Sequence, residues 1–199
     1  MKLLNVSEFT SIEDATSALL SITQGFDNIT YDEVIDKLNA VGDSYSSTTK
    51  DLAEGMKNVS QVLQISGNSI EQSLALLSAA NDTVQDMSKA SMGVRTVALR
   101  IAGTEEAKQQ LADMGEDVDD FVVQTNSKID AQVRNLTKTA KNPEGISVLD
   151  DTGRLRSTYD ILLDISEIYQ DIIDKDKQYG TNTSNALLEL LAGRLASSI

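Results

Sequence analysis

Adjacent carboxylates are the residues of this chain that come closest to a catalytic arrangement. Three such pairs are Glu105–Glu106, Asp119–Asp120 and Asp150–Asp151. General acid–base catalysis by two carboxylates needs one in an apolar pocket and one in a polar site, so that their pKa values differ. Nothing in the sequence distinguishes such a pair among the 31 acidic residues. We interpret all three pairs as solvated surface.

Other catalytic and metal-binding chemistry lacks its usual residues. The chain contains no Cys and no His, which removes disulfides, thiol nucleophiles, soft metal sites and the usual proton shuttle near neutral pH. No Ser lies in a Gly-x-Ser-x-Gly elbow, and no acidic run has the ligand spacing of a calcium loop. Residues 180–183 lack the glycine and lysine spacing of a phosphate loop. We predict that the chain is not an enzyme and has no catalytic, cofactor-binding or metal-binding residues.

Two arginines, Arg95 and Arg100, lie five residues apart in an apolar stretch. In one interpretation they are buried or lie at an interface and hold carboxylates of a neighbouring helix, because guanidinium groups form paired, charge-assisted bonds. In the other, which the sequence slightly favours, their stems follow the edge of an apolar stripe and their charged heads reach water. The methionines at positions 56, 87, 92 and 114 are interpreted as core residues rather than as the lining of a ligand groove.

Helices must position these side chains, because apolar residues recur at alternating spacings of three and four along most of the chain. A single Pro and an aromatic content of only 4% agree with helices that pack through aliphatic residues. The pattern predicts helices over residues 11–26, 30–42, 49–66, 70–77, 87–102, 104–114, 118–136, 157–174 and 183–199.

Polar residues and glycines mark the predicted helix ends. A hydroxyl or amide three residues before a Glu is typical of a helix N-terminus, and glycine at a C-terminus permits a left-handed stop. Gly67 is such a stop, and the serine-rich residues 43–49 are predicted to be a connector. The predicted N-terminal caps are Thr10, Thr30 and Asn68.

Residues 141–156 interrupt the helical pattern. Pro143 and Gly145 end the preceding helix, and the turn-forming run 150–153 lies between apolar residues. This predicts a short β-hairpin near residues 146–156. The predicted fold class is therefore all-α, a bundle of about eight or nine helices with one hairpin. We expect residues 1–140 to form a helical region, continuous with a hairpin and C-terminal helical pair at 141–199.

The net charge of −14 at pH 7 argues against nucleic acid as a partner. Binding to phosphates requires clustered Lys and Arg, and an acidic surface repels a polyanion. No stretch approaches the roughly 20 consecutive apolar residues that span a bilayer. Residues 1–5 also lack the charged and apolar regions of a secretion signal.

Several strings along the chain are more specific than its composition. They are SLALLSAAN (73–81) followed by VQD (84–86), VRTVALRIAG (94–103), LADMGED (111–117), VLDD (148–151) with STYDIL (157–162), and LELLAGR (188–194). These strings resemble the helical region of tail tape measure proteins from phages and prophages of Gram-positive bacteria. They occur in the family's order, and the resemblance covers the chain from about residue 6 to 194. After Arg194 the chain is shorter than the family pattern.

The resemblance implies a structural role in the tail of a siphovirus. Proteins of this family lie in the lumen of the tail tube, determine tail length during assembly and leave ahead of the DNA; before assembly they are in the host cytoplasm. The implied partners are other copies of the chain in a homo-oligomer, the tail tube protein and tail assembly chaperones. The family's usual length exceeds 199 residues, so we expect an excised fragment or a degraded prophage product.

Two further expectations remain open from the sequence. Breaks at Gly and Ser predict several packed helices in this region rather than the long rod of a molecular ruler. The alternative function is a free-standing bacterial helical module that binds a peptide or a partner helix in an apolar groove.

Overall fold

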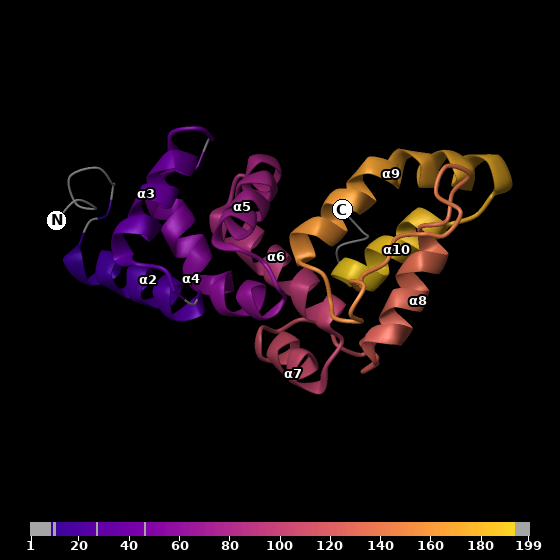
Figure 1. The fold of residues 1–199 in the computed structure, drawn as a ribbon, viewed down its shortest axis with the longest axis horizontal. Coiled ribbons are helices and arrows are strands. Elements are labelled where there is room, and N and C mark those ends of the chain that lie inside the picture. Colours follow the sequence, from indigo (N-terminus) through magenta and orange to yellow (C-terminus); the bar gives the residue numbers. More distant parts are fainter. Residues whose placement is uncertain (1–8, 10, 27, 46, 194–199) are drawn as a thin grey trace. The chain divides into compact units, whose positions relative to one another are not determined.

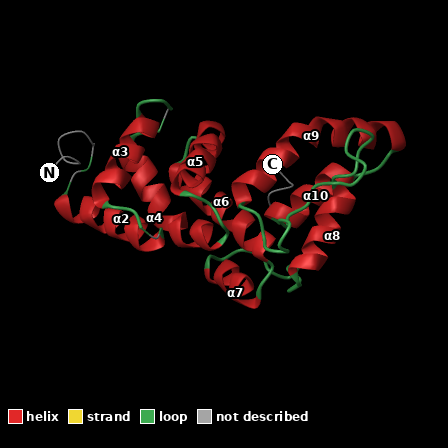
Figure 2. Cartoon of the chain, in the orientation of Figure 1, coloured by secondary structure: helices red, strands yellow, loops and turns green. Residues whose placement is uncertain are grey.

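A computed structural model describes residues 9, 11–26, 28–45 and 47–193. The predicted cap Thr10, Ser46 of the predicted connector, and residues 194–199 of the last predicted helix lie outside the described residues. The described part is helical without a β-sheet (Figures 1 and 2), which confirms the all-α fold class. Its helices are α2 (Ile12–Gly25), α3 (Tyr31–Gly42), α4 (Thr49–Ile65), α5 (Ile70–Val84), α6 (Met87–Ala102), α7 (Glu105–Asp113), α8 (Asn126–Leu136), α9 (Thr158–Tyr179) and α10 (Thr183–Ala192).

The chain divides into two compact units, Met1–Arg95 and Thr96–Ile199. The boundary between them in the sequence falls within α6. In the first unit, α2, α3 and α5 all pack against α4. The close approach of α2 to α4 depends on Gly25, because a Cβ there would lie 2.5 Å from the Cβ of Ser60. The stripe predicted for α4 is completely buried, as expected for a central helix: Leu52, Met56, Val59 and Leu63.

The second unit has its own apolar core, supplied by the end of α6, by α8, α9 and α10, and by the segment between α8 and α9. Three of the four residues in the stripe predicted for α9 are buried, and Ile168 packs partly buried against them. The buried members of this core are Ile101, Ile129, Val133, Ile146, Val148, Ile161, Ile165, Ile172, Leu187 and Leu191.

Polar side chains cap the N-termini of α2, α3 and α5, as predicted, but in α2 and α5 the capping residue is not the predicted one. Thr30 and Glu33 form the predicted capping box of α3. Helix α2 begins after Ser11, whose hydroxyl accepts a hydrogen bond from the backbone N–H of Asp14 at 3.1 Å. Hydroxyl and amide caps of this kind satisfy backbone donors that have no partner within the helix.

The prediction that Asn68 caps α5 is wrong. Ser69 is the cap, and it forms a capping box with Gln72. The side-chain amide of Asn68 instead donates to the carbonyl oxygen of Leu63 at 2.9 Å, so this residue closes the C-terminus of α4. Gly67 takes the predicted left-handed conformation, with φ of 76°.

The predicted β-hairpin is also wrong, because the described residues 146–156 contain only an isolated antiparallel bridge between Leu149 and Leu155. Backbone N–H groups that would pair between the two strands of a longer hairpin donate instead to side chains of α8 and of its C-terminal cap. The N–H of Val148 donates to Asp130 at 2.9 Å, and the N–H of Ile146 donates to the Thr137 hydroxyl at 2.7 Å. Competing side-chain bonds therefore end the strand pairing after one bridge.

Helix α8 starts eight residues later than predicted, at Asn126 instead of Val118. The preceding segment carries apolar residues at helical spacing but is held to α6 by other bonds. The backbone N–H of Gln124 donates to the carbonyl oxygen of Gly103 at 3.1 Å, and Arg100 binds two groups farther upstream. These tertiary hydrogen bonds replace the intrahelical ones that the pattern predicted.

A carboxylate joins the last two helices. Asp176, near the end of α9, accepts hydrogen bonds from the backbone N–H groups of Thr183 and Ser184 at 2.9 and 2.7 Å, and from the hydroxyls of Thr181 and Ser184. Burial raises the pKa of Asp176, but these hydrogen bonds outweigh it and hold the pKa below its ordinary value.

We expect Asp176→Ala to lower the free energy of unfolding at pH 7 by about 1–2 kcal/mol, the usual cost of losing an N-terminal cap. A carboxylate with a lowered folded-state pKa stabilises above its unfolded pKa of about 4 and loses that contribution as the pH falls toward the folded-state value. The difference between wild type and variant should therefore shrink below about pH 4. Urea unfolding from pH 7 to pH 3, with the exposed neighbour Asp174→Ala as control, measures this; a pH-independent difference would contradict it.

Candidate functional site

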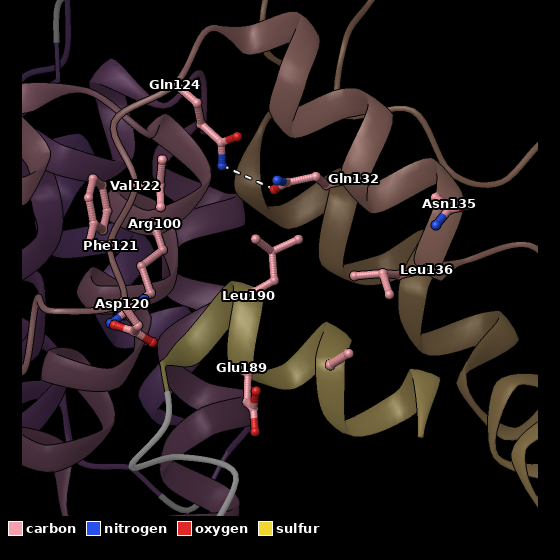
Figure 3. Close-up of a pocket in the computed structure, with 11 residues that line it drawn as sticks. Arg100, Asp120, Phe121, Val122, Gln124, Gln132, Asn135, Leu136, Glu189 and Leu190 are labelled. Atoms are coloured by element: carbon pink, nitrogen blue, oxygen red, sulfur yellow. Dashed lines mark hydrogen bonds and ion pairs between the residues drawn. The ribbon is translucent and has the colours of Figure 1, made fainter. Parts of the chain in front are cut away.

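The second unit contains an open cleft of about 400 Å³ (Figure 3). Its walls come from the end of α6, the irregular segment before α8, α8 itself and α10. This volume lies in the usual range for ligand-binding pockets, about 300–1,000 Å³. The residues that shape it are Arg100, Asp120, Phe121, Val122, Gln124, Gln132, Asn135, Leu136, Ala186, Glu189 and Leu190.

Arg100 fixes one wall of the cleft. Its guanidinium donates from Nη2 to the Asp120 carboxylate and to the backbone carbonyl of Asp117, both at 3.1 Å. The side chain is only 4% exposed, and its guanidinium carbon lies 5.8 Å from the ring centre of Phe121. Since a buried charge requires a partner, this ion pair and ring contact hold residues 117–121 against α6.

The two arginines have different surroundings. For Arg100 the first interpretation is confirmed, since it is buried and binds a carboxylate; that carboxylate belongs to an irregular segment, not to a helix. The favoured interpretation of a head reaching water is therefore wrong for Arg100. Arg95 is partly exposed and donates to the carbonyl oxygen of Asn58 in the first unit at 3.4 Å. The five-residue spacing thus produces no shared arginine site.

Amide side chains form a second wall. Gln132 and Asn135 lie three positions apart on α8, so they lie on the same side of this helix. Gln124 donates from its side-chain nitrogen to the Gln132 side-chain oxygen at 3.1 Å, which closes the upper rim of the cleft (Figure 3). Primary amides both donate and accept hydrogen bonds, so this wall can pair with either kind of polar group.

Apolar side chains form the rest of the cleft. Leu136 and Leu190 are partly buried and pack against the core of the second unit. Val122 is 68% exposed although it is aliphatic. Figure 3 shows Val122 and Leu190 from different segments facing the same space. The cleft therefore has an apolar surface with an amide rim.

The three adjacent carboxylate pairs differ in exposure. Glu105–Glu106, Asp150–Asp151 and Asp119 are exposed, in agreement with the solvated interpretation. That interpretation is wrong for Asp120, whose side chain is 14% exposed and pairs with Arg100. Within the described ranges no cluster of acidic residues could hold a metal ion, and no helix combines the length and apolar character needed to cross a bilayer.

Of the four methionines interpreted as core residues, Met56 is completely buried. Met87, Met92 and Met114 are partly buried, and Met87 occupies the space beside Gly55, where a Cβ would lie 2.5 Å from its sulfur. None of the four lines the cleft.

The cleft itself was missed by the sequence analysis. Its walls come from segments that are distant in the chain, and no local spacing signals their approach. The available sequence signals were the Val122–Val123 pair in a stretch predicted to be helical and the two amides three positions apart on α8.

Comparison with known protein families gives a match over most of the chain. A family model described as phage-related minor tail protein matches residues 1–188, which includes most of both compact units. Searches of curated proteins and of solved structures give no match.

Proposed function

This chain belongs to the family of phage-related minor tail proteins, and we propose that within the tail it is a helical region of a tape measure protein that acts in tail assembly and length determination. The family match over residues 1–188 is the observation that carries this proposal. The ordered strings that resemble tape measure proteins, including residues 73–86 and 94–103, support the finer assignment.

The two compact units favour a role in assembly contacts over a role as the measuring rod. A ruler made of one continuous helix converts residues into length at about 1.5 Å per residue. Among the described helices the longest, α9, has 22 residues, and it packs with α8 and α10 around one apolar core. This region therefore contributes to tail length as a folded part of a longer ruler.

A location in the phage tail determines the proposed partners. Other copies of the chain, the tail tube protein and tail assembly chaperones would bind through helix surfaces and need no catalytic group. The site of action is the lumen of the tail tube after assembly and the host cytoplasm before it. With a net charge of −14, the chain would not adhere to DNA passing through the tube.

Deletion and insertion in the gene of a phage or prophage that encodes the chain test this proposal. Removing codons 1–199 should abolish tails in electron micrographs of lysates, and the intact protein supplied in trans should restore them. Inserting a helical segment of about 100 residues after position 199 should lengthen the tail by about 150 Å. Unchanged length would assign the chain to another minor tail protein, and normal tails without the segment would exclude an assembly role.

The cleft gives a specific reason to retain one alternative, a bacterial helical module that binds a peptide outside any tail. That function requires the apolar groove but no contact with tail components. Mass spectrometry of purified virions distinguishes these two functions. Peptides of this chain should be detected in isolated tails only if the chain is a tail component.

A further inference from the structure

We propose that the cleft of the second unit docks a peptide segment of another protein, one that presents an aliphatic side chain flanked by Lys or Arg. This inference concerns a binding surface and holds whether or not the chain measures tail length.

The apolar part of the occupant follows from the cleft walls. Val122 is 68% exposed, and Leu136 and Leu190 remain partly exposed beside it. Exposed aliphatic groups that line one cavity gain free energy when an apolar side chain displaces their water. A space of about 400 Å³ accommodates a side chain and adjoining backbone, but not a folded domain.

The amide side chains at the rim indicate that the occupant presents peptide backbone groups. The side-chain amide of Asn135 is exposed and has no hydrogen-bond partner within the described residues, so its donors and acceptor are available. Gln132 accepts one bond from Gln124, which leaves its side-chain nitrogen to donate. Together these amides offer both donors and acceptors, which match the alternating N–H and C=O groups of an extended peptide.

The charges of the cleft residues indicate that Lys or Arg flanks the apolar side chain of the occupant. The one cation in the lining, Arg100, is already paired with Asp120. Glu189, also in the lining, is exposed and has no ion-pair partner in the described part of the chain, so the lining carries a net negative charge. Charge complementarity therefore selects Lys or Arg beside the apolar side chain and rejects Asp or Glu.

A peptide array tests the proposal. The labelled 199-residue protein is applied to nine-residue peptides of Ala and Ser with a central Leu, flanked by Lys, Ser or Glu. Val122→Ser removes apolar surface from the cleft, and Glu189→Lys reverses a charge in its lining. Val84→Ser is the matched control, because Val84 is 47% exposed and belongs to the first unit. Circular dichroism verifies that each variant is folded.

We expect retention of the Lys-flanked peptides, a loss of at least about threefold with Val122→Ser, and a switch of preference to Glu flanks with Glu189→Lys. Val84→Ser should bind as wild type. Methyl NMR shifts at Val122, Leu136 and Leu190 on adding the best peptide should place it in the cleft. The proposal is overturned if no peptide is retained, if flanking charge has no effect, if Val84→Ser loses as much as Val122→Ser, or if hexylamine alone gives the same methyl shifts as the peptide.

Discussion

Replacing Asp120 with alanine is expected to lower the free energy of unfolding of the second unit by about 3 kcal/mol. The variant leaves the guanidinium of Arg100 buried, at 4% exposure, without its carboxylate. The remaining bond to the carbonyl of Asp117, at 3.1 Å, and the Phe121 ring cannot compensate a full charge in this position. An uncompensated buried charge costs more than the ion pair itself contributes.

Urea denaturation at pH 7 measures this effect, with Asp119→Ala as the matched control. Asp119 is the exposed neighbour and forms no ion pair with Arg100, so its loss should cost less than about 0.5 kcal/mol. The double variant Arg100→Met with Asp120→Leu should recover most of the lost stability, because well-packed apolar residues often replace a buried pair at little cost. Equal effects of Asp119→Ala and Asp120→Ala would show that Arg100 does not depend on this carboxylate.

The helices could be predicted from the sequence where local chemistry and packing agree. For α4 the apolar spacing and the glycine stop at Gly67 predict a helix over residues 49–66, and the observed helix is Thr49–Ile65. Residues 118–125 show why periodicity alone fails. Their apolar spacing suits a helix, but the bonds to Arg100 and Gly103 hold them in an irregular path, and such distant partners have no local signature.

The cleft could not be predicted for the same reason. Gln132 and Asn135 could be placed on one side of a helix from their spacing, but no pattern shows that Leu190 and Val122 face them. The hairpin failed because Asp130 and Thr137 take backbone donors of residues 146–148, which a count of turn-forming residues does not consider. For the hairpin and for residues 117–120, a polar side chain from a distant segment determines the backbone path.

Replacing Gly145 with alanine is expected to destabilise the second unit by about 4 kcal/mol. Gly145 has a φ of 73°, which residues with a Cβ rarely adopt. A Cβ at this position would lie 2.0 Å from the carbonyl oxygen of Arg134. That atom is backbone in the last turn of α8 and cannot turn away as a side chain could.

Gly153→Ala distinguishes the two causes of the lost stability in Gly145→Ala, which are the positive φ and the clash with α8. Gly153 has a similar φ of 81°, but no atom lies within 4 Å of the position its Cβ would take. Its replacement should therefore cost only the conformational strain, about 1–2 kcal/mol. Thermal and urea unfolding of both variants measures the difference, which is the part due to contact with α8. Because the segment after Gly145 supplies Ile146 and Val148 to the core, Gly145→Ala should also expose apolar surface. Equal losses in the two variants would mean that the segment can move away from α8 at no cost.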